Sequence, residues 1–205
     1  MTASNILSNL LLPLEPTLLK WWTLQNYYRI SEVGILPPGE RTELLYGHIA
    51  LMAARGTSYV MTLRLLATTL DALLANAPVL VIAQALIQLD DFSEPETDLA
   101  IVQGNVQNYV GHHLQPAQVY LVLEVAAPTL KQDCEVKERV YAQTGIADYW
   151  VLNLNNCQLH ICRGPTSTDY IPLTIPAISF LLSQHRLRLQ RFPSSLFPFP
   201  KSCPR

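Results

Sequence analysis

Two carboxylates stand where apolar strands are expected to begin or end. Glu124 is the one ionisable residue in VYLVLEVA, and Asp98 lies at the start of the apolar stretch TDLAIV. Alternation along a strand places Glu124 on the same face as Tyr120 and Val122, among apolar neighbours. A lone buried carboxylate costs several kcal/mol, so Glu124 needs a cationic partner, a bound metal or a proton.

These two carboxylates would form an oxygen-rich site if they converge from the ends of neighbouring strands. Mg²⁺ and Mn²⁺ prefer oxygen ligands and keep several waters for chemistry. Each residue also has an ordinary structural explanation. Asp98 would be a turn residue at a strand entry, and Glu124 would pair with a nearby Lys or Arg. The residue types alone leave both explanations open.

A helix that follows Glu124 supplies a cation. Asp133 is expected to cap this helix, which runs through CEVKERVYAQTG and ends at Gly145. Lys137 and Tyr141 are four residues apart, so they lie on one helical face. The composition of KQDCEVKER is equally compatible with Lys137 being a solvated surface lysine.

Hydrophobic patterning predicts the elements that hold these side chains. LQNYYRISEVG is expected to be a helix that Thr23 caps and Gly34 ends. TELLYGHIALM is expected to be a hairpin that turns near Tyr46-Gly47, and helical spacing extends from about Ser58 to Ala75.

The remaining patterns predict strands. VLVIAQALIQL, TDLAIV and VYLVLEVA read as strands, ADYWVLNL and CQLHICR as a hairpin around Asn155-Asn156, and TDYIPLTI as an edge strand. The order of helices and strands predicts an α/β fold with a central mixed β-sheet flanked by helices.

Composition narrows the class of protein. The chain has 205 residues, of which 49% are hydrophobic and 15% charged, with a net charge of −2. One domain with a substantial core is expected, and any nucleic-acid contact would need a local basic patch. The apolar-rich composition favours a homodimer or higher homo-oligomer.

The N-terminal sequence and the cysteines indicate the cellular location expected for the protein. Residues 1–22 are expected to be a docking arm instead of a signal peptide, because the apolar stretch lacks a basic start and Pro13 interrupts it. No apolar run approaches the roughly 20 residues that a membrane helix requires. The four cysteines form no CxxC pair and show no zinc-ligand spacing, so a cytoplasmic protein is expected.

The ordered combination of RTELLYGHIALM, IAQALIQL, EPETDLAIV and LVLEVAAPTLKQDCEVKERVYAQTGIADYWVL resembles the bacterial putative restriction endonuclease family, which was long described only as a domain of unknown function. That family belongs to the PD-(D/E)xK nuclease superfamily. The resemblance covers roughly residues 23 to 180. It implies a restriction-endonuclease-like core in a domain at 23–190, followed by a Pro-rich tail at 191–205.

The resemblance implies roles for individual residues. Asp98 and Glu124 would be metal ligands for Mg²⁺ or Mn²⁺, with the backbone carbonyl of Val125 as a third. Glu43, the acid of the ELxxG hairpin, would face the same metal. Lys137 matches the catalytic lysine. Gln84 and Tyr141 match residues that orient the substrate or the attacking water.

Three positions depart from the family pattern. Ala126 stands where the motif lysine is expected, so Lys137 of the following helix takes that role in the resemblance. Thr97 replaces the usual proline before Asp98. Tyr59 replaces a histidine at the start of the helix after the hairpin, which puts a supporting contact in question.

The function implied is metal-dependent hydrolysis of DNA phosphodiester bonds. Two alternatives remain open on the sequence: a non-catalytic nuclease-fold binding or assembly module, and a metal-dependent hydrolase of a small phosphorylated substrate. The 14 Lys and Arg residues are few for a protein that binds duplex DNA by its phosphates.

Overall fold

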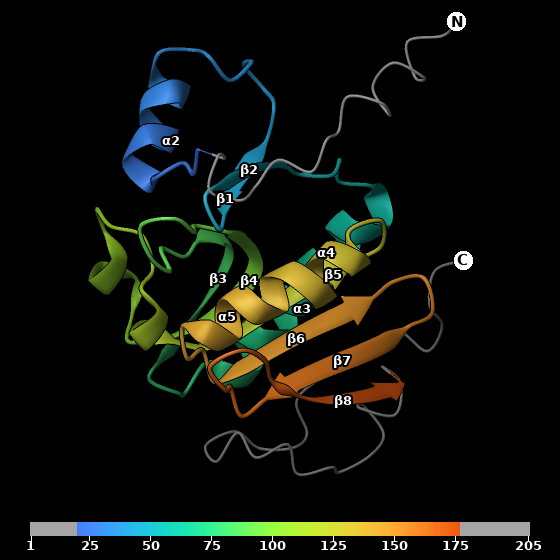
Figure 1. The fold of residues 1–205 in the computed structure, drawn as a ribbon. Coiled ribbons are helices and arrows are strands. Elements are labelled where there is room, and N and C mark those ends of the chain that lie inside the picture. Colours follow the sequence, from blue (N-terminus) through green and yellow to red (C-terminus); the bar gives the residue numbers. More distant parts are fainter. Residues whose placement is uncertain (1–19, 177–205) are drawn as a thin grey trace, which may run out of the picture.

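The computed structural model describes residues 20–176, and a six-stranded mixed sheet lies at its centre (Figure 1). Neighbouring strands are antiparallel except for β5 and β6, which are parallel. The strand order follows the chain: β3 (Val79–Leu86), β4 (Glu96–Gln103), β5 (Val119–Ala126), β6 (Asp148–Asn153), β7 (Gln158–Arg163) and β8 (Ile171–Pro176).

Helices cover both faces of the sheet (Figure 1). On one face lies α3 (Thr57–Leu74). On the other lies the crossover from β5 to β6, which a parallel pair requires. This crossover consists of α4 (Leu130–Gln132), a π-helical segment (Asp133–Lys137) and α5 (Glu138–Gln143).

A short helix and a two-stranded hairpin stand at one end of the sheet (Figure 1). The helix α2 (Leu24–Glu32) precedes the hairpin of β1 (Thr42–Leu45) and β2 (His48–Leu51). Two single 3-10 turns, Val106–Tyr109 and Pro116–Gln118, lie between β4 and β5.

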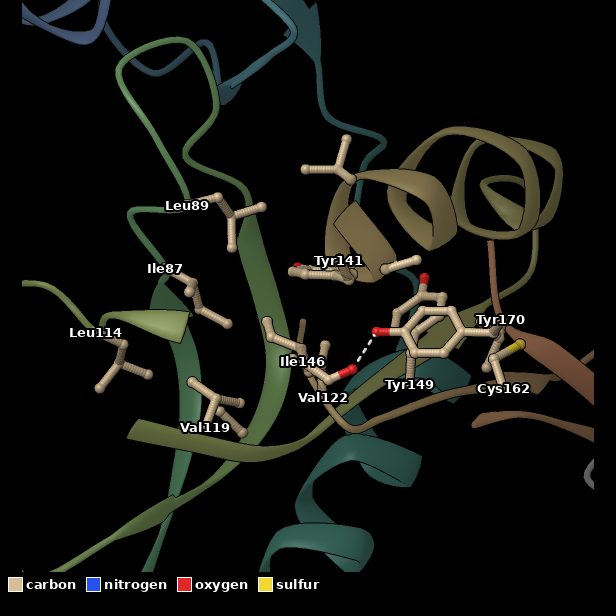
Figure 2. Packing of buried hydrophobic residues seen from close by; sticks show 14 of the residues in the cluster. Ile87, Leu89, Leu114, Val119, Val122, Tyr141, Ile146, Tyr149, Cys162 and Tyr170 are labelled. Carbon is tan, nitrogen blue, oxygen red and sulfur yellow. Dashed lines mark hydrogen bonds between the residues drawn. The ribbon is translucent and has the colours of Figure 1, made fainter. Parts of the chain in front are cut away.

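The core has two parts, one on each face of the sheet. The leucines of α3 recur at helical spacing and pack against Leu121 and Leu123 of β5. On the other face, Val122 packs with Tyr141 and Tyr149 beneath α5 (Figure 2). The alternation predicted for β5 is therefore confirmed, and Glu124 lies on the face that the crossover covers.

Most predicted elements are confirmed, and so is the α/β class. Thr23 caps α2, because its side chain accepts a hydrogen bond from the backbone N–H of Asn26. The first hairpin turns at Tyr46 and Gly47, which both have positive φ. A side chain at position 47 would press against Trp21, because a Cβ there would stand 2.9 Å from the Trp21 Cβ. β8 forms the predicted edge strand.

The predicted start of the crossover helix is wrong. Asp133 does not cap it, because the helix begins at Leu130 and the Asp133 N–H already donates to the Thr129 carbonyl at 3.0 Å. Asp133 instead has helical backbone angles and a buried side chain in the first position of the π-helical segment. The wider π turn replaces a regular helical turn here.

The arm and the tail lie almost wholly outside the described residues, so the predicted division at 1–22, 23–190 and 191–205 stays a prediction. Of the arm, the backbone N–H of Trp22 donates to the Gly47 carbonyl and so joins the arm to the first hairpin. Within residues 20–176, no helix combines the length and the apolar character that crossing a membrane demands.

Candidate active site

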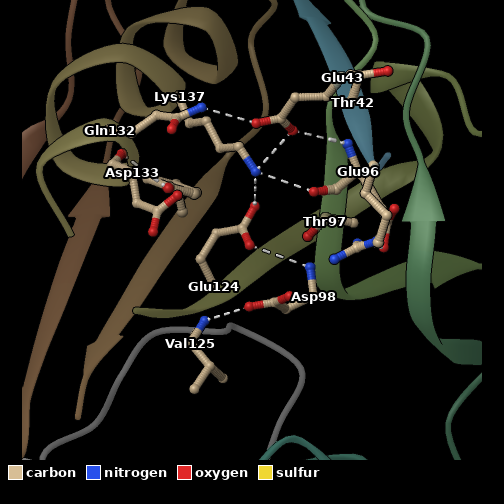
Figure 3. Close-up of polar contacts among 12 residues, drawn as sticks. Thr42, Glu43, Glu96, Thr97, Asp98, Glu124, Val125, Gln132, Asp133 and Lys137 are labelled. Carbon is tan, nitrogen blue, oxygen red and sulfur yellow. Dashed lines mark hydrogen bonds and ion pairs between the residues drawn. The ribbon is translucent and has the colours of Figure 1, made fainter. Parts of the chain in front are cut away.

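The ladder between β4 and β5 stops where the two predicted acids stand. Leu99 and Leu123 form the last backbone pair. Beyond it the Asp98 N–H donates to Glu124 Oε2 at 3.3 Å, and the Val125 N–H donates to Asp98 Oδ2 at 2.7 Å (Figure 3). Each carboxylate thus satisfies a backbone donor that the open ladder leaves without a strand partner. This exchange fixes Asp98 and Glu124 next to each other.

The hairpin brings a third acid to the same place. Leu44 is fully buried and forms a bridge with Glu94, which docks β1 on the loop that precedes β4. The neighbouring Glu43 is 2% exposed, and its side chain points toward the start of β4 and toward Lys137. Its carboxylate accepts from Gln132 Nε2 at 3.0 Å and from the Glu96 N–H at 3.3 Å.

Lys137 reaches into this group of acids and is 4% exposed, so it is not a surface lysine. Its Nζ lies 3.1 Å from Glu43 Oε2 and 3.3 Å from Glu124 Oε1, and it donates to the Glu96 carbonyl at 3.1 Å (Figure 3). An ammonium group has three N–H donors, so each one has an acceptor here.

Burial and charge shift the pKa values of these groups. Burial lowers the pKa of Lys137, but Glu124 and Glu43 outweigh it and hold that pKa well above its ordinary value. Burial raises the pKa of the Glu124 carboxyl, with Lys137 opposing the rise. Burial also raises the pKa of Asp133 to about 6, again against the pull of Lys137. The lysine is therefore charged at neutral pH.

Two arginines stand at the mouth of the site. Arg41 and Arg55 both pair with Oε1 of Glu96, and the Arg41 Nη2 lies 2.7 Å from it. The Arg55 guanidinium also lies 5.9 Å from the centre of the Tyr59 ring. The Tyr59 hydroxyl donates to Asp98 Oδ1. Tyr59 therefore supplies a contact to the metal-ligand candidate despite the departure from the family histidine.

A pocket of about 490 Å³ contains this arrangement. Of the residues predicted from the sequence, five line it together: Glu43, Asp98, Glu124, Val125 and Lys137. The structure thus brings these residues to one place, whereas their catalytic roles remain predictions.

Gln84 and Tyr141 do not line the pocket. With its amide oxygen turned toward Arg55, Gln84 accepts from that guanidinium at 2.8 and 3.1 Å, so it holds an arginine of the mouth. Tyr141 is fully buried beside Tyr149, with ring centres 5.0 Å apart, and its hydroxyl has no hydrogen-bond partner among the described residues (Figure 2). Tyr141 therefore packs behind the site, and its role in orienting substrate or water stays a prediction.

Sequence reasoning missed several members of the site. Glu96 stands two residues before Asp98 in EPETD, and its spacing along the strand would have placed it near the same site. The pattern predicts a helix cap at Asp133, whereas the structure places this residue in the pocket wall. The sequence suggests Arg41 and Arg55 as cations that a symmetric dimer would gather around a cleft, but no local pattern predicts that they meet at Glu96 within one protomer.

The donor set fits a hard divalent cation. Asp98, Glu124 and the Val125 carbonyl would present only oxygen atoms, and Mg²⁺ needs just one or two protein carboxylates because it keeps its waters. The Val125 N–H points toward Asp98, and a strand residue directs its carbonyl to the same side as its N–H. Within residues 20–176, no cluster of three or more acidic, His or Cys side chains forms a ready-made cage.

A solved structure described as a putative nuclease belonging to DUF820 from Anabaena variabilis ATCC 29413 matches with a TM-score of 0.60. The two sequences are 11% identical, and the match covers 75% of this chain and 84% of that chain, which shows a shared fold. Curated proteins gave no match.

A family profile gives the remaining comparison. The profile described as "Uma2: Putative restriction endonuclease" matches residues 24–195, which is most of the chain and includes every residue of the pocket. The protein therefore belongs to the Uma2 putative restriction endonuclease family.

Proposed function

We propose that this protein is a metal-dependent nuclease that hydrolyses phosphodiester bonds of DNA. The observation that supports it best is the opening of the β4–β5 ladder, where Asp98 and Glu124 stand side by side with Lys137 buried against them. Family membership supports a nuclease-like activity.

Different residues of the chain have different roles in the proposed reaction. Asp98, Glu124 and the Val125 carbonyl would hold Mg²⁺ or Mn²⁺, which when bound polarises a phosphoryl oxygen and lowers the pKa of a bound water. Lys137 fixes Glu43 and Glu124 and places a positive charge beside the phosphate that gains negative charge in the transition state. Because all three of its donors are engaged, Lys137 acts by position and charge more than by holding the attacking water.

The arginines at the mouth suit a phosphate backbone. Arg41 and Arg55 carry two positive charges against the single carboxylate of Glu96, and both are partly exposed. A guanidinium has five donors in a planar fork that matches phosphate oxygens. The contacts to Glu96 and Gln84 leave some of these donors for a ligand and hold both side chains in place before it arrives.

Metal binding and cleavage test the proposal together. Calorimetric titration with Mn²⁺ should show binding to the wild type and loss of binding in Asp98→Asn. The matched control is Asp71→Asn, an exposed acid of α3 outside the pocket, which should bind like the wild type. Equal binding by wild type and Asp98→Asn would refute the ligand assignment.

Activity is assayed with Mn²⁺ on plasmid DNA, single-stranded DNA, RNA and mononucleotides. Cleavage of DNA that Asp98→Asn lacks supports the proposal. Hydrolysis of mononucleotides alone would instead favour the small-substrate alternative. Metal binding with no hydrolysis of any of these would favour the non-catalytic alternative.

A further inference from the structure

The proposed hydrolysis needs a group that takes a proton from the attacking water, and Lys137 is not free to do so. Its charged ammonium has no lone pair, and its three protons point at Glu43, Glu124 and the Glu96 carbonyl. The proton acceptor must therefore be sought among the acids of the pocket.

Four of these acids are already engaged. Glu43 accepts from Gln132, the Glu96 N–H and Lys137, and Glu124 accepts from the Asp98 N–H and Lys137. Asp98 accepts from Tyr59 and the Val125 N–H. Glu96 accepts from both arginines of the mouth. These four carboxylates hold the site together and are poor candidates for a proton acceptor.

Asp133 differs from them. It lines the pocket and is 4% exposed, and the Thr129 side chain beside it in the pocket wall favours its charged form. Figure 3 draws Asp133 on the helical segment that also carries Lys137, with no dashed line reaching its carboxylate. Among the described acids of the pocket, it is the one that no cation or backbone N–H pins.

The π-helical segment puts Asp133 there. The Tyr149 hydroxyl donates to the Asp133 carbonyl at 3.0 Å from beneath, and the Asp133 N–H donates to the Thr129 carbonyl. The segment begins at Asp133 and ends at Lys137, so one widened turn carries both side chains into the pocket. π turns of this kind occur frequently at functional sites.

We propose that Asp133 is a further catalytic residue, the general base that takes a proton from the attacking water; this rests on the proposed nuclease function. The water oxygen forms a bond to phosphorus while one of its protons moves to the Asp133 carboxylate. The bond from phosphorus to the leaving oxygen breaks, and that oxygen keeps the electron pair and takes a proton from solvent water. Asp133 then returns its proton to solvent.

The electrostatic surroundings agree with this role. The charged groups that act on Asp133 are Lys137 of its own segment, Glu124 of β5, Asp98 of β4 and Glu43 of the hairpin, while Tyr149 of β6 and Cys134 lie close enough to feel its charge. A base works best when its pKa lies near the working pH, and burial raises the pKa of Asp133 to about 6. Because the base must be ionised, the rate should rise with pH until Asp133 has lost its proton and then level off.

The test compares Asp133→Asn with wild type at saturating Mn²⁺, on plasmid DNA and on bis(p-nitrophenyl) phosphate. The variant should lose about a hundredfold or more in rate, the usual range for general acid–base catalysis, and should lose the rise of the rate with pH that the wild type shows. Its metal affinity by calorimetry should equal that of the wild type. Glu135→Gln is the matched control, since Glu135 is exposed on the same segment and should keep both rate and pH profile.

A second variant distinguishes a catalytic role of Asp133 from a loss of activity caused by misfolding. In Asp133→Ala, added formate should restore part of the rate, because a small carboxylate fills the vacated place; a purely structural role would give no such rescue. An active wild type whose pH profile and rate survive in Asp133→Asn overturns the inference while the proposed function stands. A wild type that hydrolyses neither substrate overturns both.

Discussion

At the scale of single residues, the position of Lys137 explains how a nuclease site can lack a lysine two residues after its second acid. Ala126 stands in that place and is fully buried in the core beneath the crossover. Glu124 and Ala126 share one face of β5, and the crossover packs on that face. A lysine from the crossover therefore reaches Glu124 from above, while the strand position is left to a small packing residue.

Lys137→Ala should cost stability as well as activity. Removing the ammonium leaves Glu43 and Glu124 buried without their cation, and breaking a buried ion pair in this way costs about 3–5 kcal/mol. Urea unfolding measures the loss. Lys131→Ala is the control, because that side chain is 84% exposed and should change stability by less than about 0.5 kcal/mol. Equal stability of the two variants would show that Lys137 carries no structural charge pairing.

The sequence predicts part of this site for clear physical reasons. Alternation of side chains along β5 is enough to place Glu124 on a covered face. Asp98 lies on the strand that precedes β5 in the chain, so the order of the strands predicts that the two acids are neighbours. Three features have no such local signal. The sequence around the i→i+5 turn at Asp133 looks like an ordinary helix start. The left-handed backbone of Gln84 is not typical of glutamine. Arg41, Arg55 and Glu96 meet only in the folded chain.

At the scale of elements, two irregularities shape the pocket. The π turn widens the crossover at the acids, and Gln84 breaks the regular backbone of β3 with a φ of 56°. Ala83 pairs with Leu99 and Ala85 with Thr97, so Gln84 lies across from Asp98 but leaves the ladder. The distortion falls at the same level of the sheet as the opening between β4 and β5 and lets the Gln84 amide reach Arg55.

The difference in unfolding free energy between Gln84→Gly and Gln84→Ala measures the strain of the left-handed backbone at position 84. Both variants lose the amide that holds Arg55, but only glycine adopts a left-handed backbone without strain. We expect the glycine variant to be more stable by about 1 kcal/mol in denaturant unfolding. If the alanine variant is as stable as the glycine variant, the backbone at position 84 stores no strain, and the distortion must follow from the neighbouring strands.

At the scale of the whole molecule, charge limits how the protein can hold DNA. The net charge is −2, and Lys137 is buried among acids, so the arginines of the mouth are the pocket cations best placed for phosphates. Arg64 is exposed on α3 and does not line the pocket. A single protomer thus offers about two phosphate contacts near its site. A symmetric pair would double them, which keeps the predicted homodimer as the arrangement best suited to a duplex.

The salt dependence of DNA binding tests this prediction. Each phosphate contact contributes about −0.9 to the slope of log K against log salt, so two contacts give about −2 and a dimer with four gives about −4. Fluorescence anisotropy without divalent metal measures the slope while cleavage is off, and sedimentation gives the mass of the protein. Arg41→Gln should flatten the slope by about 1 in a monomer and about 2 in a dimer, because each protomer loses one contact. Arg64→Gln should leave it unchanged. A steep slope that Arg41→Gln does not alter would place the DNA on another surface. A monomeric mass with a slope near −2 would exclude the homodimer and would leave the proposed arginine contacts intact.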